Sequence, residues 1–125
     1  MSEQASTVSV PYKWFSQNPF RSTYFACLAM AAEMSTGILA LAHIHKRQPS
    51  VSMLVIKMEA HYYKKAVGRT YFTCEEGIVL KEVIEKAIAT GEGQSLTVTS
   101  TGKNVVGEKV AEFFITWSFK AKALR

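Results

Sequence analysis

The stretch STYFACLAMAAEMSTGILALAHI, residues 22–44, holds one formal charge, the carboxylate of Glu33, near its middle. Its 23 residues are enough to span a membrane as a helix. A carboxylate near the bilayer centre would cost on the order of 2.5–3.5 kcal/mol, however, and the segments that follow read as strands that need a covering helix. We therefore expect a buried helix of a folded domain and no membrane span.

This helix is predicted to begin near Ser22 or Thr23, either of which can cap it, and to end at residues 43–46, whose basic side chains suit a helix C-terminus. Because it is apolar on nearly all sides, we expect other elements to enclose most of it. Carboxylates are almost never fully buried without a partner, so Glu33 needs polar neighbours in any interpretation.

The rest of the chain alternates between apolar and polar residues in short runs, which predicts strands. In the segment 50–63 the alternation places Leu54, Ile56, Met58, Ala60 and Tyr62 on one face. Helical spacing of Val79, Val83 and Ala87, with Ile84 and Ile88, predicts a second helix that ends at Gly91 and Gly93. The predicted strands are residues 6–12, 50–63, 69–76, 94–102 and 108–122, and the last two form a hairpin.

One long apolar helix and a twisted antiparallel sheet have an evident packing solution, in which the sheet wraps around the helix. We therefore predict an α+β fold with a long central helix, in a single domain that covers residues 1–125. A hydrophobic content of 48% with 20% charged residues is ordinary for a globular protein.

The chain carries a net charge of +5, but its basic residues are scattered, as on a solvated surface or one that attracts an anionic ligand such as a phosphorylated cofactor. No nucleic-acid motif or basic stripe occurs, so we expect no nucleic-acid partner. Cys27 and Cys74 lack metal-site spacing, and we expect no metal. The N-terminal residues MSEQASTVSV do not resemble a signal peptide, which makes the cytoplasm the expected location.

The segment NPFRSTYFACLAMAAEMSTG resembles the hotdog-fold acyl-CoA thioesterases. Small single-domain members carry Asn or Gln, five residues, His-Gly-Gly, six residues, then Asp or Glu. Asn18 and Glu33 stand at that spacing here, whereas the His-Gly-Gly positions hold residues 24–26, Tyr-Phe-Ala. The later KMEAHYYKKAVGRT resembles the family's second strand and the turn after it, with Lys65 in place of a proline. The chain thus looks like a little-characterised branch of the family that lacks His-Gly-Gly.

The resemblance implies a site shared between two subunits, and helix geometry agrees. Glu33 lies nine residues after Tyr24, or about 13 Å along the helix, so one carbonyl group cannot reach both the N-terminal amides and Glu33 of one chain. An antiparallel pair of helices in a homodimer would bring one subunit's amides beside the partner's carboxylate. A dimer of dimers would keep this arrangement.

Within that site, Glu33 would act as general base or nucleophile, Asn18 would orient the water or the carbonyl, and Tyr24 would supply a hydroxyl donor. The substrate would be an acyl-CoA or an acyl-carrier thioester, so CoA is part of the substrate and no separate cofactor is expected. The expected substrate-binding residues are Phe25, Ala26 and Met30 for the thioester and acyl chain, and Lys57, Lys64, Lys65 and Arg69 for the CoA phosphates.

Two other functions stay open. A non-catalytic hotdog dimer that binds an acyl or aromatic ligand is favoured by the replacement of His-Gly-Gly, and Glu33 would then be a structural acid. A thiol-ester dehydratase ranks last, because no histidine lies at the place where that chemistry needs one.

Overall fold

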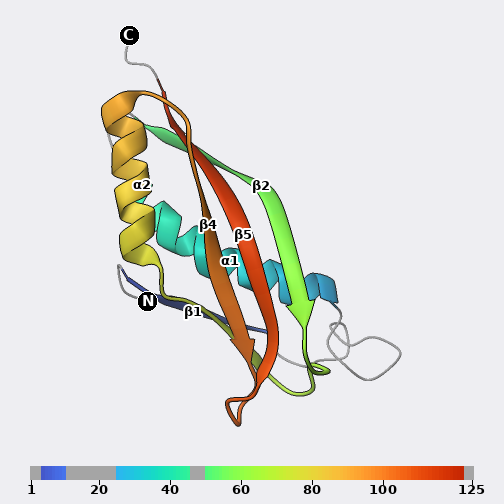
Figure 1. Cartoon of the computed structure of the whole chain (residues 1–125). Helices are drawn as coiled ribbons and strands as arrows, with labels where there is room; N and C mark the ends of the chain where they lie inside the picture. Colours follow the sequence, from blue (N-terminus) through green and yellow to red (C-terminus); the bar gives the residue numbers. More distant parts are fainter. Residues whose placement is uncertain (1–3, 11–24, 46–49, 123–125) are drawn as a thin grey trace.

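The computed structural model describes residues 4–10, 25–45 and 50–122, which form two helices and an antiparallel sheet (Figure 1). The sheet has the strand order β1-β3-β4-β5-β2. In chain order the elements are β1 (Ser6–Val10), α1 (Phe25–Ile44), β2 (Val51–Tyr62), β3 (Thr70–Cys74), α2 (Gly77–Thr90), β4 (Gln94–Lys103) and β5 (Lys109–Ala121). This is the predicted order of strands and helices, and the predicted α+β class is confirmed.

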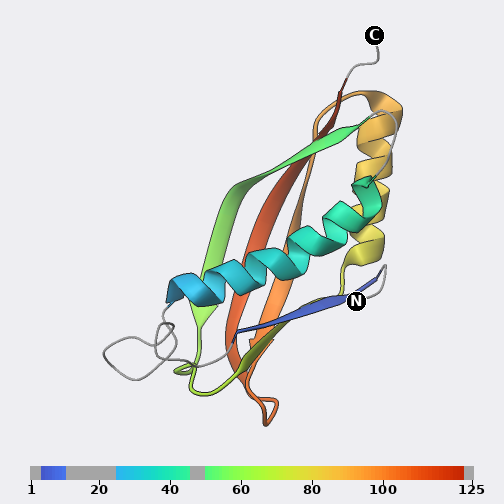
Figure 2. The ribbon, with the colours of Figure 1, turned by 180° about the vertical axis from the view of Figure 1, so that it is seen from behind.

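The long helix α1 crosses one face of the bent sheet, from the free edge of β2 to the side of α2 (Figure 2). It contacts β1, β3, β4, β5 and α2. Its segment Cys27–Ile44 is long and apolar enough to cross a membrane by length and composition alone. The sheet and α2 bury one side of this segment, as expected for the core helix of a folded domain.

The inner face of β5 supplies much of the core. Its alternate residues, from Val110–Ala111 through Phe113, Ile115, Trp117 and Phe119, are buried. They pack with buried residues of α1, among them Leu28, Ala32, Leu39 and Ala40. Removal of these side chains from water is the main force that holds the helix on the sheet.

Buried hydroxyl groups fix the position of α1 along the sheet. Ser6 Oγ donates to the Ser35 carbonyl at 2.8 Å, and Ser35 Oγ donates to the Ala32 carbonyl at 2.7 Å. Ser35 Oγ also lies 2.7 Å from Ser100 Oγ, which is therefore the donor of that pair. These bonds satisfy polar groups that would be costly to bury alone, so they favour one register of helix against sheet.

A β-bulge in β2 corrects the predicted face of that strand. The pairing with β5 shifts between Val55 and Lys57, so Ile56 has no partner and the alternation changes phase there. Met58, Ala60 and Tyr62 pair with inward residues of β5 and face the helix, whereas Leu54 lies opposite Ser118 on the outer face. The uniform alternation expected from the sequence was wrong for this strand because one extra residue reverses every following side chain.

The second helix is confirmed, but its buried side is rotated relative to the prediction. Gly77, Leu80, Ile84 and Ala87 are buried, whereas Val79 is 41% exposed. The helix ends at Gly91, whose φ of 70° is left-handed and whose N–H donates to the Ala87 carbonyl.

Candidate active site at the helix and the sheet edge

Glu33 lies in the middle of α1, at the border between its buried and exposed sides, and is half-buried. At about 100° per residue, Met30, Met34 and Leu41 point in nearly the same direction, and Glu33 is turned away from them by about 60–100°. These three apolar side chains are 60%, 49% and 54% exposed. The predicted enclosure of α1 on most sides is therefore incomplete, because one apolar stripe is open.

The Glu33 backbone carbonyl accepts a hydrogen bond from Thr36 Oγ1 at 2.9 Å. Its side-chain carboxylate forms no hydrogen bond or ion pair with another residue of the described ranges 4–10, 25–45 and 50–122. The neighbouring residues Ser35 and Thr36 use their hydroxyls in hydrogen bonds to the backbone, to Ser100 and to Trp117. Within one chain, these two neighbours leave the carboxylate available to a ligand or to a second subunit.

The open stripe of α1 continues onto the free edge of the sheet. Strand β2 pairs only with β5 within the described sheet, and Figures 1 and 2 both place its C-terminal end beside the N-terminal end of α1. Its apolar side chains at positions 54, 56, 58 and 62 are 38–66% exposed. Met58 and Tyr62 lie on the side of β2 that faces the helix, whereas Leu54 lies on the outer side of the sheet. We call Met30, Met34 and Leu41, together with Met58 and Tyr62, the open apolar face.

Residues Phe25 and Ala26 lie in the first turn of α1. The amide groups of a first helical turn have no acceptor within the helix, and they concentrate its positive end. Phe25 and Glu33 are eight residues apart, about 12 Å along the axis. Asn18 and Tyr24 lie outside the described residues, so their predicted roles stay predictions.

The four basic residues expected to bind CoA phosphates fall into two places. Lys57 lies on β2, whereas Lys64, Lys65 and Arg69 lie in the loop between β2 and β3, at the end of the sheet where α1 begins (Figure 2). Lys64 forms an ion pair with Glu108, and Arg69 Nη1 donates to Ser9 Oγ at 2.8 Å. All four side chains are exposed, and the structure brings none of them into contact with Glu33.

A groove of about 650 Å³ lies elsewhere, on the outer face of β3 and β4. The sheet separates it from α1, and none of the predicted site residues in the described part of the chain lines it. Its walls are Tyr71, Thr73, Glu75, Glu76, Thr99, Thr101, Lys103, Asn104, Val105 and Gly107. Size alone would favour this groove as a ligand site, but it offers no route to Glu33, and we base the candidate active site on the helix instead.

Other titratable groups add little to this site. Burial raises the pKa of the Cys74 thiol to about 11, so the thiol is protonated and a poor nucleophile at neutral pH. The hydrogen bond from His61 lowers the pKa of Glu59 on the exposed face of β2. Within the described ranges no three His, Cys, Asp or Glu side chains are grouped so that they could hold a metal ion.

Residues 1–119 match the family model of a domain of unknown function, DUF4442. The chain belongs to this family. No functionally curated protein has a significantly similar sequence.

Solved structures of low sequence identity share the fold of this DUF4442 domain. PA5026 of Pseudomonas aeruginosa, described as a probable thioesterase, has a TM-score of 0.82 at 18% identity, over 95% of this chain and 78% of that one. Thioesterase HI1161 of Haemophilus influenzae has a TM-score of 0.70 at 10% identity, over 97% and 75% of the two chains. A mutant form of thioesterase PA1618 of P. aeruginosa has a TM-score of 0.73 at 11% identity, over 98% and 78%.

These likenesses confirm the predicted hotdog fold. At such low identity they establish only the fold, so the activity of this chain must be argued from its own residues.

Proposed function

We propose that this DUF4442 protein is a homodimeric thioesterase that hydrolyses acyl-CoA or acyl-carrier thioesters at sites shared between two subunits. The observation that supports this most is the position of Glu33, halfway along α1 beside an apolar stripe that the single chain leaves open. The cytoplasmic location expected from the sequence belongs to the same proposal.

A second copy would cover the open apolar face and complete the site. If two α1 helices pack antiparallel, the first-turn amides of one subunit lie beside Glu33 of the other, which resolves the separation of about 12 Å within one chain. Each dimer would hold two such sites by symmetry. The open edge of β2 offers unpaired backbone groups at the same boundary, and it could extend the sheet into the partner.

In the proposed reaction, the Glu33 carboxylate takes a proton from water as the water oxygen attacks the thioester carbonyl carbon. The negative charge that develops on the carbonyl oxygen is stabilised by the first-turn amides of α1, at residues 25 and 26. Collapse of the tetrahedral intermediate breaks the carbon–sulfur bond, and the leaving thiolate takes the proton that Glu33 had accepted from water. Asn18 would orient the water or the carbonyl, and the Tyr24 hydroxyl would add a donor to the oxyanion.

Substrate binding follows the same layout. Met30 would line the path of the acyl chain, since methionine adapts its shape to different apolar ligands. Lys64, Lys65 and Arg69 lie in one loop at the end where α1 begins, so they suit the phosphates of CoA better than Lys57, which lies farther along β2. A nucleophilic role for Glu33, with a mixed anhydride intermediate, uses the same geometry.

The test is release of free thiol from a panel of acyl-CoAs, from acetyl to palmitoyl, by wild-type protein and by Glu33→Gln. We expect turnover by the wild type and a loss of at least about a hundredfold in the variant, since the amide cannot accept the proton. Glu82→Gln, an exposed change on α2, is the matched control and should keep full activity. No turnover of any thioester by the wild type would contradict the proposal.

The second candidate function is a non-catalytic dimer that binds an acyl or aromatic ligand. The observation in its favour is Tyr-Phe-Ala at residues 24–26, where related thioesterases carry His-Gly-Gly. It predicts that Glu33→Gln changes unfolding stability or ligand affinity without any hydrolysis to lose. A Glu33-dependent hydrolysis rate would exclude it.

A further inference from the structure

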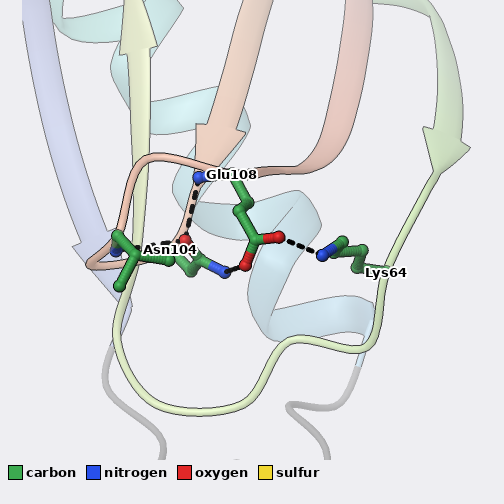
Figure 3. A network of polar contacts seen from close by, with 4 residues as sticks. Lys64, Asn104 and Glu108 are labelled. Carbon is green, nitrogen blue, oxygen red and sulfur yellow. Dashed lines mark hydrogen bonds and ion pairs between the residues drawn. The ribbon is translucent and has the colours of Figure 1, made fainter.

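The turn that joins β4 to β5 is held by a network of polar contacts around Asn104 and Glu108 (Figure 3). Asn104 Oδ1 accepts hydrogen bonds from the backbone N–H groups of Val106 and Glu108, at 3.2 and 2.9 Å. Asn104 Nδ2 donates to Glu108 Oε1 at 3.1 Å, and Lys64 forms an ion pair with the other oxygen of that carboxylate. Gly107 completes the turn with a left-handed φ of 85°.

This ordered turn presents two apolar side chains to water. Val105 and Val106 are 70% and 74% exposed, more than any other large apolar residue in the described part of the chain. Turn apices are usually polar or glycine-rich, and β-branched valine gives the turn no conformational advantage. Val67, 58% exposed, lies in the neighbouring loop that carries Lys64. The fold therefore holds a convex apolar tip rigidly in solvent.

Positive charges surround this tip. Lys103 lies opposite Lys109 in the β4–β5 ladder, beside a register shift at Gly102, and the two like charges repel each other. Lys65 and Arg69 add two further cations in the adjacent loop. Two carboxylates close to the turn already face cations: Glu108 pairs with Lys64, and Glu112 lies 3.6 Å from Lys109. Glu75 and Glu76 lie farther along the groove on β3 and β4 that Lys103 also lines.

We propose that this end of the molecule docks on the surface of an anionic lipid bilayer, with Val105 and Val106 inserted among the headgroups and the lysines around them on lipid phosphates. A small convex tip with a basic collar fits a fluid, negatively charged surface. A protein partner would more commonly be held by aromatic anchors in fitted pockets. The inference goes beyond thioester hydrolysis and does not depend on it.

The test is co-sedimentation of the full chain with vesicles of phosphatidylcholine alone and with vesicles that contain phosphatidylserine. Binding to the anionic vesicles only, weakened by added salt, is the expected result. The double variant Val105→Ser/Val106→Ser should bind at least about tenfold more weakly, because the apolar tip is lost. The double variant Lys103→Gln/Lys109→Gln should lose about fivefold for each lysine removed.

Matched controls separate docking by the tip from general attraction of a basic protein. Ile78→Ser/Val79→Ser removes two exposed apolar side chains from α2, and Lys120→Gln/Lys122→Gln removes two charges at the other end of β5 (Figure 1). Both control variants should bind like the wild type. The proposal is overturned if the wild type does not bind anionic vesicles or if the Val105/Val106 serine variant binds normally. It is also overturned if the Lys120/Lys122 variant loses as much affinity as the Lys103/Lys109 variant.

Discussion

The indole Nε1 of Trp117 donates a hydrogen bond of 2.9 Å to Oγ1 of Thr36, which in turn donates to the carbonyl of Glu33. This chain of two bonds ties the inner face of β5 to the helical turn that carries the candidate catalytic carboxylate. At the next position, Gly37 lies so close to the same indole that an added Cβ would be 3.3 Å from Trp117 Cζ2. These contacts with the sheet thereby fix the position of α1 along its axis and its rotation about that axis, and with them the position of Glu33.

Thr36→Val should destabilise the protein by about 1–3 kcal/mol, because it leaves the buried indole N–H without an acceptor. Thr36→Ser keeps the hydroxyl and is the matched control, with a smaller loss from the deleted methyl group. Urea unfolding followed by tryptophan fluorescence measures both. Equal stability of the valine and serine variants would show that the hydrogen bond contributes nothing.

Gly102→Ala should destabilise the fold by about 1–3 kcal/mol through overpacking. A Cβ at this position would lie 2.5 Å from Cε1 of Phe72, whose ring is fully buried on the inner face of β3. Gly93→Ala is the control near the other end of β4, since its nearest neighbour would be the Phe119 carbonyl at 4.0 Å. Thermal unfolding of the two variants should therefore differ, and a normal melting temperature for Gly102→Ala would contradict the packing described here.

The stability of the protein should fall as the pH rises above about 9 because of Cys74. Burial raises the pKa of this thiol from 9.0 to about 11, so between these values the unfolded chain has released the proton while the folded chain retains it. Raising the pH in this window favours the unfolded state. Melting temperatures of wild type and Cys74→Ala between about pH 8 and 10.5 measure the effect, which should be smaller in the variant; parallel curves would contradict it.

The long apolar stretch and the alternation of β5 were sufficient to predict the fold, because a helix that is apolar on most sides and a strand with one buried face must cover each other. The β-bulge at Ile56 was not predictable in this way, since one unpaired residue leaves no mark in an alternating sequence yet reverses the faces of Met58 and Tyr62. The burial of Leu80 in place of Val79 likewise depends on how α2 docks, which local periodicity does not determine.

The candidate site was only partly accessible to sequence reasoning. The apolar stretch predicted that Glu33 lies on the central helix, and the structure places it there. The pairing of Asn18 with Glu33 stays a prediction, because Asn18 lies outside the described residues. The half-exposure of Glu33 and the open stripe beside it were not foreseen, because an apolar helix sequence does not reveal which side the sheet leaves uncovered. The hairpin between β4 and β5 was predicted, but the contacts of Glu108 with Asn104 and Lys64 were not, since they form only when the hairpin and the neighbouring loop meet.

Met30→Glu/Met34→Glu should convert the proposed dimer into monomers and abolish thioester hydrolysis. Both side chains are exposed in the single chain, so the monomer should remain folded, while the dimer would have to bury two unpaired carboxylates per subunit. We expect the dimer dissociation constant to rise by at least about a hundredfold, equivalent to roughly 2.8 kcal/mol. Sedimentation velocity over a range of concentrations, with circular dichroism to confirm folding, measures this change.

Ile78→Glu is the matched control, because it places a carboxylate at a side chain of similar exposure on α2, away from the open apolar face. This variant should keep the dimer and the activity of the wild type. A folded, monomeric Met30/Met34 variant that still hydrolyses acyl-CoA at the normal rate would show that one subunit suffices. The separation of about 12 Å between Glu33 and the first-turn amides would then require another oxyanion donor within the same chain.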